Sequence, residues 1–336
     1  MTAFVGHRQA RLRVLRLLIW SLWTTVLAAP CAEPAFAQGF QDEVHILAPS
    51  KLARRTERGP TLKANVDLVL VNVTVTDSED RFVSNLQARD FSVLDGKHPQ
   101  EIRYFSSEDA PMSVAVILDT SRSMRNNLEQ ARSAAMEFFR YSNPQDEFAV
   151  VAFADAPRLQ ADFTDSTADI EAALQPIQAD GYTALWDAIY LGLREMRNAR
   201  FGKKALLVIS DGGDNHSRYT QGELKSVLKE ADVQVYAIDI FERYPKTPEE
   251  KSGLLALDEV TSVTGGRVFL THGADELHRA VRQISEELRT QYVLGYSLSQ
   301  SARDGKWHKL KVGLNRPKSQ KLRIYAKTGY YGPVDR

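Results

Sequence analysis

The stretch Met112–Met124, with the sequence MSVAVILDTSRSM, decides how this chain folds. The run up to Leu118 is mostly apolar, as is typical of a buried β-strand. Asp119, Ser121 and Ser123 follow where that strand should end. In open α/β sheets, ligands bind just beyond the carboxyl ends of the strands. The Asp-x-Ser-x-Ser pattern therefore predicts a site of hard oxygen donors, which magnesium and calcium prefer.

Strands and helices alternate through residues 111–289, and this alternation predicts the fold class. It indicates βαβ units, and hence an α/β domain with a doubly wound, mostly parallel, Rossmann-like sheet. The expected strands are Ser113–Leu118, Glu147–Phe153, Ala205–Ser210, Gln234–Ile240 and Arg267–Leu270, with Arg158–Phe163 as a more polar edge strand. The expected helices are Leu128–Tyr141, Thr167–Leu174, Leu185–Arg197, Gly222–Glu230, Gly253–Val263 and Ala274–Arg289.

The two segments that flank this domain, 65–110 and 290–336, have the period-two pattern of β-strands. Each flank alone has too few strands to bury a sandwich core. We therefore hypothesise that both flanks together form one β-sandwich, with the α/β domain inserted between them. The expected flank strands begin at Val66 and continue with Phe82–Val83, Asp90–Leu94, Glu101–Phe105, Gln291–Leu298, Trp307–Leu314 and Lys321–Ala326.

Two later segments add oxygen donors at the same edge of the predicted sheet. The segment 180–188 opens a helix and contains Thr183, and the apolar strand that includes Leu206 ends in Asp211. The strands that end at Asp119 and Asp211 are expected to be neighbours across the topological switch point, where a crevice opens. The alternative is that these residues only cap helices and fill turns, which Asp, Ser and Thr also favour, and that the domain has lost its ion.

Together these three segments resemble a von Willebrand factor type A domain with its metal-ion-dependent adhesion site. The resemblance covers roughly residues 111–289. All five positions of the family's site are present, and its Asp-x-Ser-x-Ser motif, loop threonine and strand-end aspartate match Asp119, Ser121, Ser123, Thr183 and Asp211. The flanks resemble, more loosely, a bacterial subgroup of secreted proteins related to this family, through 86–91, 292–296 and 328–331.

The resemblance implies a function in protein binding. In the family, the serine hydroxyls and in some cases the threonine contact the metal directly, and the aspartates hold it through water. Magnesium keeps several waters in its near-octahedral oxygen coordination, which suits such ligands, and manganese or calcium are the alternative ions. One position stays open for an acidic residue of a protein partner. The expected function is a metal-dependent protein-binding or adhesion module that is not an enzyme.

Residues beside the site are expected to form a rim for the partner. Arg122 and Arg125 could steer an acidic partner, although exposed arginines are more commonly solvated surface. Tyr182 could contribute to an interface, because aromatic side chains are enriched at binding hot spots. For Trp186, a place in the rim and a place in the core are equally open.

The alternative function from another class is a metal-dependent hydrolase or phosphatase. Such an enzyme needs a base to activate water, and Asp214 and His216, shortly after Asp211, are the candidates for that role. The sequence has no His-Glu-x-x-His, Gly-x-Ser-x-Gly or Gly-x-x-x-x-Gly-Lys motif. A third interpretation is a structural envelope module with a vestigial metal site, whose work is done by the β-flanks.

Residues 1–37 have the features of a secretory signal peptide. Arginines near the start precede an apolar stretch, Leu17–Ala29, and Ala35-Phe36-Ala37 forms a cleavage site. An uncleaved anchor is the alternative, but the stretch is shorter than the ~20 residues that a membrane-spanning helix needs. We expect export to the periplasm or secretion, a flexible leader at 38–64, and no membrane span after cleavage. The only cysteine, Cys31, would be removed, so no disulfide is expected.

The charge balance argues against a nucleic-acid partner. Cleavage after Ala37 would leave 39 basic and 42 acidic side chains, because the first 37 residues contain four arginines and one glutamate. Binding to nucleic acid requires a clustered positive surface, and a slightly acidic chain does not indicate one.

Overall fold

The computed structural model describes residues 68–211, 213–241, 248–316 and 321–334. The expected signal peptide at 1–37 and leader at 38–64 lie outside this range. In the part of the chain that the structure describes, no helix combines the length and the apolar character that crossing a membrane requires.

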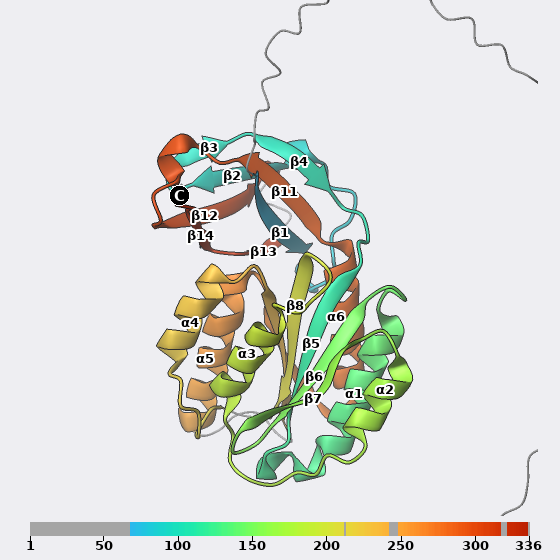
Figure 1. Cartoon of the computed structure of the whole chain (residues 1–336). Helices are drawn as coiled ribbons and strands as arrows, with labels where there is room; N and C mark the ends of the chain where they lie inside the picture. Colours follow the sequence, from blue (N-terminus) through green and yellow to red (C-terminus); the bar gives the residue numbers. More distant parts are fainter. Residues whose placement is uncertain (1–67, 212, 242–247, 317–320, 335–336) are drawn as a thin grey trace, which may run out of the picture. The chain divides into compact units, whose positions relative to one another are not determined.

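A sheet of six strands forms the centre of the α/β domain, and Figure 1 shows it between the helices. Its strands are β5 (Met112–Asp119), β6 (Glu147–Phe153), β7 (Pro157–Thr164), β8 (Lys203–Ser210), β9 (Gln234–Phe241) and β10 (Val268–His272). Their order is β10-β9-β8-β5-β6-β7, and all neighbours are parallel except β6 and β7. The chain moves outward from β5 to β7 and resumes at β8 on the other side of β5. The predicted switch point therefore lies between β5 and β8.

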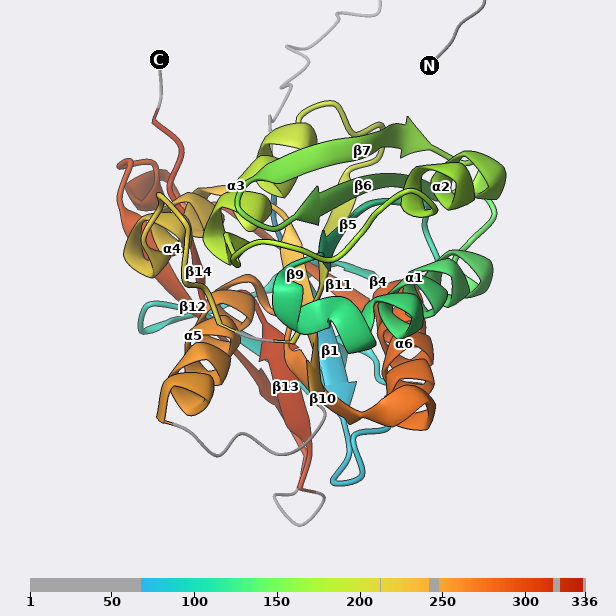
Figure 2. The same cartoon turned by 90° about the horizontal axis from the view of Figure 1, so that it is seen from below.

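Helices cover both faces of this sheet, as the view of Figure 2 also shows. One face packs against α1 (Leu128–Tyr141), α2 (Thr167–Leu174) and α6 (Gly273–Thr290), and the other against α3 (Leu185–Glu195), α4 (Gln221–Glu230) and α5 (Pro248–Thr264). Every residue of β5 and β6 is buried. Strands covered on both faces read as continuous apolar runs rather than alternating ones, which is why the sequence identified them. The predicted doubly wound α/β fold is confirmed.

Both flanks contribute to a pair of four-stranded antiparallel sheets. Their orders are β13-β1-β11-β4 and β14-β12-β2-β3. Buried side chains from both sheets share one core, in which Val71 and Val73 meet Phe91 and Tyr292. The hypothesis of one sandwich built from the two ends of the chain is therefore confirmed. The strands are β1 (Leu68–Thr76), β2 (Phe91–Asp95), β3 (His98–Gln100), β4 (Ile102–Ser106), β11 (Tyr292–Ser297), β12 (Trp307–Leu314), β13 (Arg323–Ala326) and β14 (Gly329–Tyr331).

The expected strand at Phe82–Val83 is wrong. Only a single bridge forms there, between Thr76 and Phe82, because a tight turn at Asp77 uses the intervening backbone groups. Asp77 Oδ1 accepts hydrogen bonds from the backbone N–H groups of Glu79 at 2.8 Å and Arg81 at 3.0 Å. The sequence reading also missed the short strands β3 and β14, which lie at the edges of their sheet.

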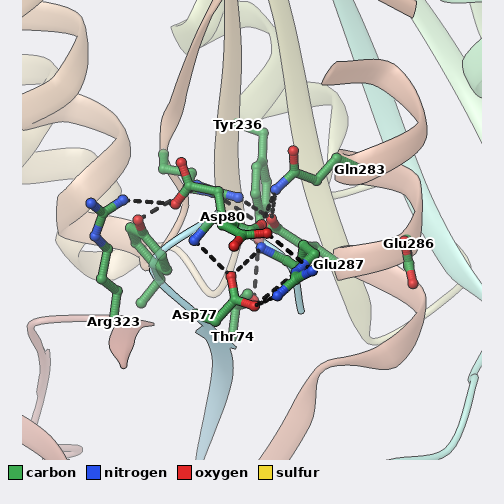
Figure 3. A network of polar contacts seen from close by, with 12 residues as sticks. Thr74, Asp77, Asp80, Tyr236, Gln283, Glu286, Glu287 and Arg323 are labelled. Carbon is green, nitrogen blue, oxygen red and sulfur yellow. Dashed lines mark hydrogen bonds and ion pairs between the residues drawn. The ribbon is translucent and has the colours of Figure 1, made fainter. Parts of the chain in front are cut away.

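A polar network joins the sandwich to the α/β domain (Figure 3). Gln291 Nε2 donates hydrogen bonds to Thr74 Oγ1 and to the hydroxyl of Tyr236, both at 3.1 Å. Beside them, the guanidinium of Arg267 forms an ion pair with Glu287 on α6 and a second with Asp80 at 3.3 Å. These contacts are buried or half-buried, so the two parts of the chain meet through specific polar groups.

Candidate functional site

Asp119 links the carboxyl ends of two neighbouring strands. It is the last residue of β5 and is fully buried. Its Oδ1 accepts a hydrogen bond from the backbone N–H of Ser121 at 2.8 Å, and its Oδ2 accepts one from Ser210 Oγ, at the end of β8, at 2.5 Å. Burial raises the pKa of the Asp119 carboxyl, and these hydrogen bonds oppose the rise. The turn after β5 is therefore fixed against β8.

The two serines of the Asp-x-Ser-x-Ser pattern continue this set of contacts. Ser121 immediately precedes the short 3-10 helix η2 (Arg122–Asn126) and is almost fully buried. Its hydroxyl lies 3.0 Å from Ser123 Oγ, and Ser123 Oγ donates a hydrogen bond to Asp211 Oδ1 at 2.9 Å. Hydrogen bonds thus join four of the five predicted site residues, Asp119, Ser121, Ser123 and Asp211, into one connected group of oxygens, in which the backbone N–H of Ser121 makes the link to Asp119.

Thr183, the fifth predicted residue, lies in a loop that is hydrogen-bonded to the turn after β5, which carries Ser121 and Ser123. The backbone N–H of Asp180 donates to the carbonyl of Thr120 at 2.9 Å, and that of Arg122 donates to the carbonyl of Gly181 at 3.1 Å. Gly181 has a φ of +92°, and a Cβ there would collide with the Asp155 carboxyl at 2.9 Å. Because glycine alone adopts this conformation without strain, the loop can approach the turn that carries the serines.

The loop after β8 holds Asp211 and the Thr183 loop together. Asn215 Oδ1 accepts a hydrogen bond from the backbone N–H of Thr183 at 2.9 Å. A Cβ on Gly213 would lie 2.9 Å from the Cα of Gly253 on α5, so the two backbones touch at a point where only glycines fit. Asn215 was not identified as a site residue from the sequence, because its role depends on a contact between segments distant along the chain.

The two candidates for a catalytic base have other contacts. Asp214 Oδ1 accepts hydrogen bonds from the backbone N–H of Trp186 at 3.3 Å and from Ser217 Oγ, so it supports the start of α3. The ring of His216 stacks on Tyr182 with 5.0 Å between centroids. Trp186 is buried in the core. Of the two positions considered for it, the core is therefore correct and the rim is not.

The predicted rim residues lie beside the site, but the arginines are paired. Arg122 Nε and an Arg125 guanidinium nitrogen lie 3.2 and 3.3 Å from Asp180 Oδ1. A hydrogen bond from the backbone of Gly181 and the charge of Arg122 lower the pKa of the Asp180 carboxyl. Tyr182 is 63% exposed. The rim therefore presents one exposed aromatic side chain and two arginines that share a carboxylate.

Asp239, near the end of β9, is a buried carboxylate that the sequence analysis did not single out. It is 4% exposed, and its Oδ1 has no hydrogen-bond partner among the described residues. Burial, together with the negative charges of Asp211 and Asp119, raises the pKa of Asp239 to about 7. The signal in the sequence was a single charged residue at the carboxyl end of an apolar strand, the position at which Asp119 also lies.

The donor set fits a hard divalent cation. Hydroxyl and carboxylate oxygens converge, and such oxygens suit magnesium, manganese and calcium. Among the residues that the structure describes, no group of three or more His, Cys, Asp or Glu side chains lies close enough to hold a metal ion. A cation at this edge would therefore depend on the serine and threonine hydroxyls, with the carboxylates in support.

Comparison with known proteins agrees with this architecture. Residues 114–213 match the family model of the von Willebrand factor type A domain, and that range contains all five predicted site residues. The α/β part of the chain is a von Willebrand factor type A domain. Domains of this family commonly mediate protein–protein interaction and are typically not enzymes. No curated protein matches the chain.

Several solved structures are similar to the chain at low sequence identity. A von Willebrand factor type A protein from Catenulispora acidiphila has a TM-score of 0.47 and 14% identity, with 76% of each chain covered. The hypothetical protein BatB from Bacteroides thetaiotaomicron has a TM-score of 0.43 and 18% identity, over 52% of this chain and 98% of BatB. A variant of the PilB minor pilin from Streptococcus sanguinis has a TM-score of 0.46 and 12% identity, and the match covers 54% of this chain and 62% of the pilin.

Proposed function

We propose that this chain is an exported protein-binding module that takes a divalent cation at the carboxyl edge of its six-stranded sheet and uses it to bind an acidic residue of a protein partner. Magnesium is the proposed ion, with manganese or calcium as alternatives. The observation that carries the proposal is the connected group of oxygens formed by Asp119, Ser121, Ser123 and Asp211.

The chemistry of this group supports a binding role. Neutral hydroxyls as direct ligands leave a divalent cation strongly electron-poor, because they do not neutralise its charge. Ser121, Ser123 and Thr183 would hold the cation, and Asp119 and Asp211 would orient the hydroxyls and accept hydrogen bonds from surrounding water. A carboxylate presented by a partner would then find both a charge and an open position. Tyr182, which is exposed, would lie at the edge of that contact.

The alternative of a metal-dependent hydrolase has less support. A catalytic base needs hydrogen-bond reach to a water at the cation. Asp214 is engaged with the start of α3, and His216 stacks on the exposed Tyr182. Among the described residues, neither side chain forms a hydrogen bond with the connected oxygens, although the backbone N–H of His216 donates to the carbonyl of Thr183 at 3.1 Å. Protein binding is therefore the function that the site supports best.

Calorimetric titration of Mg²⁺ tests the metal part of the proposal. The protein should bind Mg²⁺ saturably. The single change Asp119→Ala should abolish this binding, and so should the double change of Ser121→Ala with Ser123→Ala. The far-ultraviolet circular dichroism of these variants should match that of the wild type. Asp162→Ala is the matched control, because Asp162 is an exposed carboxylate on β7 that, among the described residues, bonds only to the backbone of Phe163. Saturable binding that survives the double serine change would contradict the proposal.

A peptide array tests the acidic partner. Peptides with aspartate or glutamate, each beside its amide counterpart, are probed in Mg²⁺ and in chelator. Capture should require both the carboxylate and the Mg²⁺. Capture of amide and acid forms alike would show that the cation has no part in binding.

Export is supported by the sequence of residues 1–37. Amino-terminal sequencing of the protein recovered from the periplasm or the medium of an expressing bacterium should give Gln38 as the first residue. A chain that retains Met1 in the cytoplasm would contradict this part of the proposal.

A further inference from the structure

We propose that Asp239 is a further residue of the cation site, a third carboxylate that attracts the divalent cation through water rather than by direct contact. This inference rests on the proposed function, since it presupposes that the site takes a cation. It adds a residue from β9, a strand that contributes none of the five predicted positions.

Asp239 lies in one row with two residues of the site. Leu118 pairs with Ile209, so Asp119 and Ser210 are the next residues along β5 and β8, and Ser210 pairs with Asp239 on β9. Because side chains alternate between the faces of a sheet, the residue two positions earlier on each strand shares the face of the row. Those three residues belong to the same buried cluster beneath α3, α4 and α5: Ile117, Val208 and Ala237. The carboxylates of Asp119 and Asp239 thus point to the same side, with Ser210 between them.

The position of Asp239 is fixed by the interior of the sheet. Its strand is paired on both sides, with Ser210 on β8 and Leu270 on β10 opposite it. Its backbone carbonyl accepts a hydrogen bond from Thr271 Oγ1 at 3.2 Å. The side chain therefore extends from a rigid element, which is how precise sites are built.

The carboxylate of Asp239 lacks the compensation that burial requires. It is 96% buried, and no described residue donates a hydrogen bond to its Oδ1. A buried polar atom without a partner is costly, more so when it is charged. An apolar side chain would not carry this cost, so the unpartnered carboxylate points to a role beyond the packing of β9. The nearest site that uses negative charge is the one beside Asp119.

Electrostatic coupling supports the same assignment. The charges of Asp211 and Asp119 act on Asp239 and add to the effect of its burial. The three carboxylates therefore share one local field, and a divalent cation among them would relieve their mutual repulsion. They are not close enough together to form a direct three-carboxylate metal site. Asp239 therefore acts on the cation through water and through its charge.

Titration of Mg²⁺ into the wild type and into Asp239→Asn tests the inference. The amide keeps the size of the side chain and removes its charge. Affinity should fall about tenfold or more, the range in which supporting partners of metal ligands act. Asp146→Asn is the matched control. Asp146 is 1% exposed at the opposite edge of the sheet, where its carboxylate accepts hydrogen bonds from the backbone of Met112 and Asn143. Its affinity for Mg²⁺ should equal that of the wild type.

A second measurement separates a role at the cation from a structural role. Melting in chelator reports folding alone, and Asp239→Asn should melt there at least as high as the wild type, because it no longer buries a charge. The increase in melting temperature on adding Mg²⁺ should be smaller than in the wild type. Asp239→Ser, measured in the same way, controls for a loss of stability that only the asparagine side chain would cause.

The outcomes distinguish this inference from the function on which it rests. If the wild type binds Mg²⁺, and Asp239→Asn and Asp239→Ser bind it as tightly as the wild type does, Asp239 is no part of the site and the proposed function stands. If both variants unfold in chelator, the carboxylate is structural and the inference fails. If the wild type itself binds no Mg²⁺, both the function and the inference are overturned.

Discussion

Two buried carboxylates at opposite edges of the α/β sheet have contrasting surroundings. Glu287, near the junction with the sandwich, is 1% exposed and forms an ion pair with Arg267, which also bridges to Asp80. Burial raises the pKa of Glu287 and the charge of Arg267 opposes the rise. Asp239, at the carboxyl edge, is comparably buried, but its neighbours Asp211 and Asp119 add negative charge.

The contrast separates a structural use of buried charge from a functional one. At the junction, the chain supplies both signs, so the charges compensate one another within the fold. At the carboxyl edge, Asp239 lies near further negative charge, and under the proposed function a divalent cation would supply the compensating positive charge. The first arrangement joins the sandwich to the α/β domain, and we propose that the second attracts a cation.

The largest expected effect is at the junction. Arg267→Met should lower the free energy of unfolding by about 3–5 kcal/mol, because it leaves Glu287 buried without its counter-ion. Urea denaturation measures the change. Combining it with Glu287→Leu should recover most of the loss, since the pair is then replaced by apolar groups. A double variant no more stable than the single one would show that the ion pair is not the reason for the loss.

The second prediction concerns the free energy of unfolding in chelator, which Asp239→Asn should raise at neutral and higher pH by a smaller amount than Arg267→Met lowers it. The folded state keeps its proton up to about pH 7, whereas the unfolded chain releases it near pH 4, so the folded state binds more protons between these values. Stability should therefore fall as pH rises from about 5 to about 8, and Asp239→Asn should remove about 2 kcal/mol of this fall. Asp119 and Asp146, whose pKa values burial also raises, contribute in the same direction.

Urea denaturation of the wild type and of Asp239→Asn at the lower and the higher pH measures the contribution of Asp239 to the fall in stability. An identical pH dependence in the two proteins would mean that Asp239 stays ionised without cost, and the contrast with Glu287 would disappear.

The smallest effect is expected at the rim. Tyr182→Ala should change the free energy of unfolding by no more than about 0.5 kcal/mol, as exposed substitutions commonly do, and should leave Mg²⁺ affinity unchanged. On the peptide array it should weaken the capture of acidic peptides. Loss of Mg²⁺ binding in this variant would show that the aromatic pair with His216 positions the Thr183 loop rather than contacting a partner.

The fold could be predicted from the sequence because the features that determine it are local. Val114 to Leu118 form an unbroken apolar run, and Asp119, Ser121 and Ser123 follow within five residues. The strand expected at Phe82 failed because the hydrogen bonds of Asp77 determine a turn there, and hydropathy does not report them.

The remaining site features depend on contacts between distant segments. Asp239 gains its meaning from the register that sets it opposite Ser210, and no pattern within β9 reveals that pairing. The pairing of Arg122 and Arg125 with Asp180 likewise joins separate loops. The sequence therefore predicts a set of candidate cation ligands, which stays a prediction, and the structure adds which charges lie near them.

A crystal structure of the protein grown with Mn²⁺ tests the central claim most directly, because manganese scatters anomalously and replaces magnesium at oxygen sites. The account predicts an anomalous peak bonded to Ser121 Oγ and Ser123 Oγ, with the carboxylate of Asp239 on the same side of the sheet. A peak elsewhere on the protein with none at these hydroxyls, or no ordered manganese at all, would contradict it.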